Sequence, residues 1–185
     1  MACLLTTGRG LPCKSGVGGL KAIYFVDFGG IGVATDASSD LPTAAGFDGI
    51  INNITGTPTA YKFDIKGNST LETAVNSSRE NGTTFYESTL TLTLPYLDAA
   101  TNQELKLLAY ARPQVIVEDY NGNKFLVGLD NGADVNGGTI VSGAAMGDLS
   151  GFTLTMVAME KFPPPFMNAT SFAQVTVSGT QITPN

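Results

Sequence analysis

Residues 83–94, TTFYESTLTLTL, decide the fold class of this chain. Apolar and polar side chains alternate along the whole stretch. One face of an extended strand would carry Tyr86, Ser88, Leu90, Leu92 and Leu94. The opposite face would carry Glu87, Thr89, Thr91 and Thr93. Because successive side chains of a strand point to opposite sides of a sheet, this period of two predicts a long strand with one buried and one polar face.

Further strands are predicted on both sides of this one. Residues 21–28, KAIYFVDF, are rich in aromatic and branched side chains, which is typical of a strand buried on both faces. Residues 114–119 and 124–129 flank Asn121-Gly122, the strongest short hairpin signal. The remaining predicted strands are residues 48–54, 59–66, 69–75, 151–159 and 172–177.

One helix is predicted, at about residues 98–112. Thr101 and Glu104 have the spacing of a capping box, Leu97 is placed as a hydrophobic staple, and Pro113 ends the segment. Two long stretches rich in glycine or turn residues, 29–49 and 131–147, are predicted as a loop and a connection. Strands, one helix and more strands indicate a mainly β, α+β fold, with a β-sandwich or half-barrel core.

The domain organisation follows from the same pattern. Residues 1–19 are predicted to be a glycine-rich, flexible N-terminal arm, residues 20–166 a β-sandwich domain with one helix, and residues 167–185 a C-terminal strand and tail. With 185 residues the chain is long enough for one domain to bury a core.

Composition excludes several classes of partner. Acidic residues outnumber basic ones, 16 to 10, so we expect no electrostatic grip on nucleic acid. No stretch is long and apolar enough for a membrane anchor, and the first residues lack a signal-peptide core, so synthesis in a reducing cytosol is expected. Cys3 and Cys13 have no metal-ligand spacing.

Catalytic motifs are also missing from the sequence. The chain has no histidine, which removes serine and cysteine triads and the commonest zinc ligand. Lys14-Ser15 follows a glycine-rich run but lacks the preceding strand and glycine of a phosphate loop. Turn chemistry explains Asp130, Asp134 and Asp148 better than Ca²⁺ binding. We therefore predict no enzyme activity and no catalytic, cofactor or metal residues.

The C-terminal half resembles bacteriophage tail tube proteins. Gly147-Asp148 precedes the strand Gly151-Phe152-Thr153-Leu154-Thr155, and Glu160 and three prolines at 163–165 follow it. The start of the strand region, GLPCKSGVGGLKAIYFVDF, is similar to the starts of such proteins. The resemblance implies a virion protein assembled in the cytoplasm of a host bacterium. It implies hexameric rings whose inner strands form a continuous barrel, stacked through a long loop and terminal arms, with other tail or connector proteins as partners.

The polar face of residues 83–94 is the candidate channel lining. Threonine and glutamate offer phosphates no cationic partner, so DNA would pass through during ejection without specific binding. The same face would also suit the solvent side of an ordinary sandwich. Two other functions stay open: a portal-proximal ring or connector protein of a phage, and a β-sandwich adhesin that binds glycans.

Overall fold

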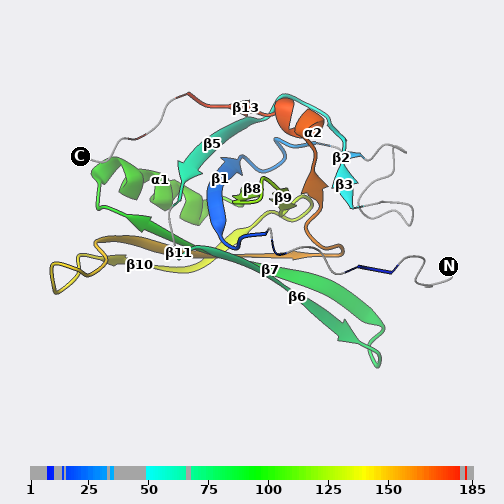
Figure 1. The fold of residues 1–185 in the computed structure, drawn as a ribbon, viewed down its shortest axis with the longest axis horizontal. Helices are drawn as coiled ribbons and strands as arrows, with labels where there is room; N and C mark the ends of the chain where they lie inside the picture. The colour runs from blue at the N-terminus through cyan, green and yellow to red at the C-terminus, as the bar shows by residue number, and fades with distance from the viewer. Residues whose placement is uncertain are drawn as a thin grey trace.

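The computed structural model describes residues 8–10, 14, 16–32, 34–35, 49–65, 68–179 and 182. The protein is mainly β, with a seven-stranded sheet and a four-stranded sheet packed face to face. Figure 1 shows the helix α1 beside the two sheets, at the end of the molecule opposite β2 and β3. The predicted fold class, a mainly β protein with one flanking helix, is confirmed.

The larger sheet has the strand order β13-β5-β1-β8-β9-β12-β3. Its strands are β1 (Leu20–Val26), β3 (Ile50–Ile51), β5 (Thr59–Asp64), β8 (Gln114–Asp119), β9 (Lys124–Val127), β12 (Phe166–Met167) and β13 (Thr176–Val177). Six of the seven residues of β1 are buried, as predicted from their two-sided apolar pattern. β8 and β9 form the hairpin predicted from Asn121-Gly122.

The four-stranded sheet is antiparallel throughout, in the order β10-β11-β7-β6. Its strands are β6 (Thr70–Ser78), β7 (Thr83–Pro95), β10 (Asp134–Val141) and β11 (Gly151–Glu160). β7 is the long alternating strand of the sequence, and Ser88, Leu90, Leu92 and Leu94 are its buried residues. β2 (Ala34–Thr35) and β4 (Asn53–Ile54) form a separate two-stranded sheet.

Two clusters of buried side chains hold the layers together. One fills the space between the sheets and includes Ile23, Val115, Leu92 and Met156. The other covers the outer face of the larger sheet, on the following residues: Ala22, Tyr24, Val26, Ile31, Ile51, Ile54, Ala60, Ile116, Leu126, Leu129, Phe162, Met167 and Val175. The larger sheet is therefore covered on both faces, whereas no layer built from the described residues covers the other face of the four-stranded sheet.

The helix α1 spans Ala99–Tyr110, close to the predicted bounds, but its cap differs from the prediction. Asp98 is the N-cap residue, and its carboxylate accepts hydrogen bonds from the backbone N–H groups of Ala100 and Thr101. The carboxylate of Asp98 accepts hydrogen bonds from the free backbone N–H groups of the first turn more strongly than the hydroxyl of Thr101, the predicted cap residue, would. Leu105 and Leu108 pack on the core between the sheets.

Two predicted segments take a different structure. The glycine-rich stretch 131–147 was predicted as a connection, but it contains the strand β10. Residues 172–177 were predicted as a strand, but the helix α2 (Ala169–Ala173) takes up the first part, and β13 holds only Thr176–Val177. Asn168 caps α2 by accepting a hydrogen bond from the N–H of Ser171, a local signal that competes with strand formation.

The N-terminal arm and the long loop are described only in part. The amide side chain of Asn121, in the β8–β9 turn, donates to the carbonyl of Val17 and accepts from its N–H. This two-point contact attaches the end of the arm to the larger sheet. Most of the arm, most of the loop 29–49 and the end of the tail lie outside the described residues, so their predicted flexibility stays a prediction.

Candidate functional site

The four candidate residues of β7 lie on the uncovered face of the four-stranded sheet. Glu87, Thr89, Thr91 and Thr93 are all partly exposed, and they alternate with the buried residues of the same strand. In Figure 1 this face points away from the larger sheet and from α1. The predicted side-chain alternation therefore holds, and it places the four residues together on one surface.

Strand register extends this surface well beyond β7. Thr89 pairs with Glu72 of β6 and with Val157 of β11, and Thr91 pairs with Thr70 and Thr155. Paired residues of antiparallel strands point to the same side of a sheet. We call the whole surface the threonine face: Thr70, Glu72, Ala74, Asn76, Phe85, Glu87, Thr89, Thr91, Thr93, Asp134, Gly137, Thr139, Thr153, Thr155, Val157 and Met159.

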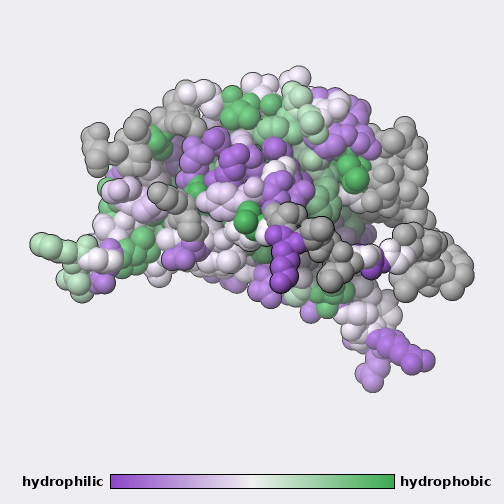
Figure 2. Space-filling model, viewed as in Figure 1, coloured by the Kyte–Doolittle hydropathy of each residue, from purple (hydrophilic) through white to green (hydrophobic). Residues whose placement is uncertain are grey.

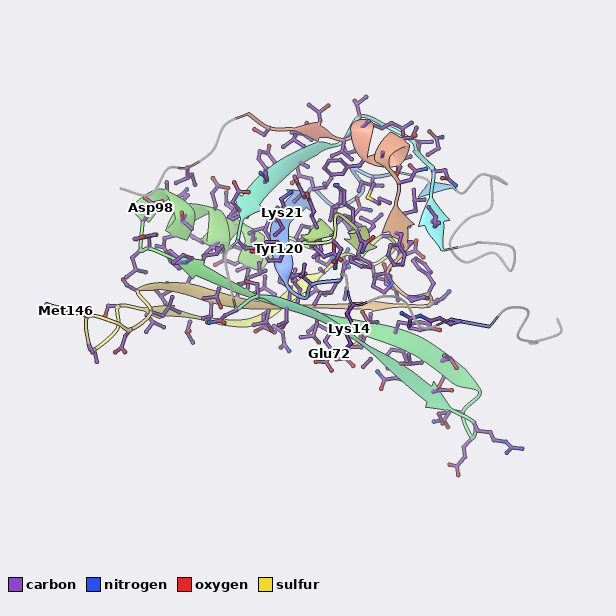
Figure 3. All side chains as sticks on the ribbon, in the orientation of Figure 1. Lys14, Lys21, Glu72, Asp98, Tyr120 and Met146 are labelled. Atoms are coloured by element: carbon purple, nitrogen blue, oxygen red, sulfur yellow. The ribbon has the colours of Figure 1, made fainter. Side chains whose placement is uncertain are left out.

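The threonine face is acidic and neutral. Its charged residues are Glu72, Glu87 and Asp134, and none of its described positions is a lysine or an arginine. Figure 3 shows Glu72 on the side of the sheet that points away from the body of the molecule. Glu87 also accepts a hydrogen bond from the side-chain amide of Asn76, at 3.2 Å. Among the described residues, no lysine or arginine forms an ion pair with these carboxylates.

Three threonine hydroxyls on this face form hydrogen bonds within the chain. The hydroxyls of Thr139 and Thr153 lie 2.6 Å apart across β10 and β11, and Thr93 donates to the carbonyl of Asn68 at 3.2 Å. Cross-strand hydroxyl pairs and β-branched side chains stiffen a sheet. The face is therefore a hydroxylated surface whose β10–β11 part is tied across the strands.

Both edges of this sheet are open. Among the described residues, no strand pairs with the outer edge of β6 or with the outer edge of β10. Neither edge contains lysine or proline, the residues that usually prevent edge-to-edge association. The two edges run in opposite directions, because β10 is antiparallel to β11, β11 to β7, and β7 to β6. The edge of one copy can therefore pair antiparallel with the opposite edge of another.

Two buried carboxylates lie outside the threonine face. Glu118 accepts hydrogen bonds from the ammonium of Lys21 and the hydroxyl of Tyr24, each at 2.8 Å. Burial alone would raise the pKa of Glu118, but these bonds and the nearby charge of Lys124 outweigh it and lower that pKa. Glu160 has the opposite shift, because burial raises its pKa more than the backbone N–H groups of Asp130 and Asn131 lower it.

These carboxylates have structural partners and no shared cleft. Glu118 ties β8 to β1, and Glu160 holds the turn after Leu129 against the end of β11. Within the described part of the chain, no three residues of the metal-binding types lie together. Neither arrangement provides the pair of facing carboxyl groups that glycoside hydrolysis requires.

A groove of about 500 Å³ opens at the edge of the larger sheet, beside the first turn of α1. Tyr61 and Phe63 of β5, Tyr96, and the charged residues Asp64 and Glu104 contribute to its lining. Tyr96 has a φ of 72°, a backbone conformation that a bulky residue rarely adopts. Asp64 already forms an ion pair with Lys62 at 2.8 Å. Nothing in the sequence pattern predicted this groove.

The chain matches no protein-family model, no curated protein and no solved structure with which it was compared. In the described ranges, neither helix has the length and the apolar character needed to cross a membrane.

Proposed function

We propose that this protein is a structural subunit that assembles with copies of itself into rings, and that the rings stack into a tube for the passage of DNA. The observation that supports this most is the four-stranded sheet. It combines an uncovered acidic and hydroxylated face with two open edges of similar length. A sheet of this kind is completed when β6 of one copy pairs with β10 of the next, which removes both edges.

The offset between the two edges fits barrel closure. Within one copy, Gly137 of β10, Thr155, Thr91 and Thr70 of β6 lie on one line across the sheet. Full overlap of β10 with a neighbour's β6 would instead bring Gly137 opposite Ala74, an offset of about four residues per copy. This is about 13 Å along the strands for about 19 Å across them, a tilt of about 35°. Closed barrels have tilts of about 35–45°.

The threonine face would line the inside of such a ring. A wall with carboxylates and no ammonium or guanidinium groups denies phosphates the contacts that release counterions, so DNA moves along it without being held. The resemblance to tail tube proteins agrees with this arrangement and adds the expectation of hexameric, stacked rings. In this account the protein acts in the virion as a conduit and carries no catalytic residues.

Two alternatives lead to different assemblies. A portal-proximal ring or connector protein would form the same closed sheet but would stop at a single ring. A glycan-binding β-sandwich would stay monomeric, and the groove beside Tyr61 and Tyr96 is the feature that favours it, because aromatic rings and carboxylates suit sugar rings.

Sedimentation velocity and negative-stain imaging of the purified protein distinguish these possibilities. We expect ring-sized species at micromolar concentration and tubes at higher concentration, with a central hole. Single rings that never stack would favour the connector function. A monomer at every concentration tested would contradict the proposed function.

A further inference from the structure

The four-stranded sheet also has an exposed apolar groove, on the side that faces α1. A groove of about 260 Å³ lies between α1 and the strands β10 and β11. Its lining is mainly apolar, and consists of Asn102, Leu105, Lys106, Gly138, Thr139, Ile140, Phe152, Thr153 and Leu154. Ile140 pairs with the buried Phe152 and so lies on the α1 side of the sheet, yet 66% of its surface is exposed. The groove runs directly beside the open edge of β10.

The edge strand at the opposite side of the sheet has a matching apolar row. Leu71, Thr73 and Val75 of β6 alternate onto the same face as the buried Leu90 of β7. Leu71 packs on the core between the sheets, but Val75 is 62% exposed. Figure 1 gives the reason, because the β6–β7 hairpin extends past the larger sheet, which leaves this end of the row uncovered. Figure 2 shows a strongly hydrophilic tip at the end of this hairpin.

We propose that the groove between α1 and β10 receives the inner row of β6, with Val75 at its end, from a neighbouring copy of this chain. The proposal rests on the ring assembly described above, because pairing of β6 with β10 places that row beside the groove. The core-facing side of the neighbour's β6 would then continue the core-facing side of β10. Helix α1 would cover the junction between the two strands as it covers the core of its own subunit. Ile140 and Val75 would both become buried.

The charge of the groove makes this proposal testable. Lys106 of α1 is the only described lining residue with a charge. With Gly137 opposite the neighbour's Ala74, Val75 lies opposite Asn136, so Val75→Lys would place an ammonium at the end of the neighbour's apolar groove, on the side that faces α1 and that lysine. We expect the concentration needed for assembly to rise at least about tenfold, because an unpaired buried charge is costly. The isolated subunit should keep the melting temperature of the wild type, since Val75 is exposed there.

A second substitution should restore assembly across the interface. In the double variant V75K/K106E, every contact joins a lysine of one copy to a glutamate of the next, and assembly should return to within about threefold of the wild type. V75K/Q103E also adds a glutamate to α1, but Gln103 is exposed and does not line the groove, so it should not rescue. Ala74→Lys places a lysine on the same edge strand but on the threonine face, away from the groove, so it should weaken assembly less than V75K does.

The measurement is sedimentation velocity over a concentration series for the wild type and these four variants. Assembly of V75K at wild-type concentrations, or equal rescue by K106E and Q103E, would overturn the proposal while the ring assembly itself stands. A wild type that stays monomeric would instead overturn the proposed function.

Discussion

Glu87 and Thr89 are the residues at which the charge of the threonine face can be reversed with least effect on folding. Both are partly exposed and alternate with buried neighbours, so Glu87→Lys with Thr89→Lys should leave the core unchanged. Each ring would gain a belt of ammonium groups. We expect assembled protein to bind DNA at low salt, with an affinity that falls steeply as salt rises. The logarithm of the binding constant should fall against the logarithm of the salt concentration with a slope of about 0.9 per phosphate contacted.

The matched control for this prediction is Glu104→Lys with Thr170→Lys. The residue types and the change in charge are the same, but both positions are exposed on helices on the other side of the four-stranded sheet. Filter binding of assembled protein to duplex DNA over a salt series measures the difference. Equal binding by the two double variants would mean that the threonine face has no special access to DNA.

Glu160 makes stability depend on pH in the direction opposite to a salt-bridged carboxylate. Its pKa is raised in the folded state, so the folded protein holds this proton more tightly than the unfolded chain does, and stability falls as pH rises from about the ordinary value of 4.5 through the raised pKa. Glu160→Gln keeps an amide oxygen for the N–H of Asp130, which Glu160 accepts at 2.7 Å. The cost of burying an ionised carboxylate at this position disappears.

We therefore expect E160Q to melt at or above the wild-type temperature at pH 7, with a difference that shrinks toward pH 4.5. Thermal unfolding followed by circular dichroism across this range is the measurement, and Glu104→Gln on the exposed surface of α1 is the control. A loss of more than about 1 kcal/mol for E160Q at pH 7 would mean that the second carboxylate oxygen has an essential partner.

At the scale of elements, β10 shows why the glycine-rich stretch was predicted incorrectly. Glycine lacks the branched side chains that signal a strand, so residues 131–147 have no apolar alternation to detect. The strand forms because β11 supplies its hydrogen-bond partners. β7 and the β8–β9 hairpin were predictable because their patterns are local. The threonine face was predictable only along β7, since the rows of β6, β10 and β11 join it through register between distant segments.

Two adjacent glycines in β10 have different roles. A Cβ at Gly138 would lie 2.6 Å from the backbone carbonyl oxygen of Thr153, whereas a Cβ at Gly137 would meet nothing within 4 Å. Gly138→Ala should therefore push β10 away from β11 and destabilise the fold by roughly 1–3 kcal/mol, while Gly137→Ala should stay within about 0.5 kcal/mol of the wild type. Urea unfolding measures both. Equal stability of the two variants would show that β10 shifts freely.

At the scale of the whole molecule, the two sheets have different purposes. The larger sheet is covered on both faces and supplies most of the core. The four-stranded sheet is anchored on one face only, and both its ends extend beyond the larger sheet in Figure 1. One end is the hydrophilic β6–β7 turn, and the other is the loop with the fully exposed Met146, labelled in Figure 3. Its edges are unpaired in a monomer. In the proposed ring, both edges would be paired and the uncovered face would line the channel.

Cryo-electron microscopy of the assembled protein, at a resolution that separates strands, tests the central claim most directly. The account predicts a closed, tilted, antiparallel barrel around a central channel, in which β6 of each copy pairs with β10 of the next and Glu72, Glu87 and Thr91 face the channel. A ring with the threonine face on its outer surface, or a protein that never leaves the monomeric state, would contradict it.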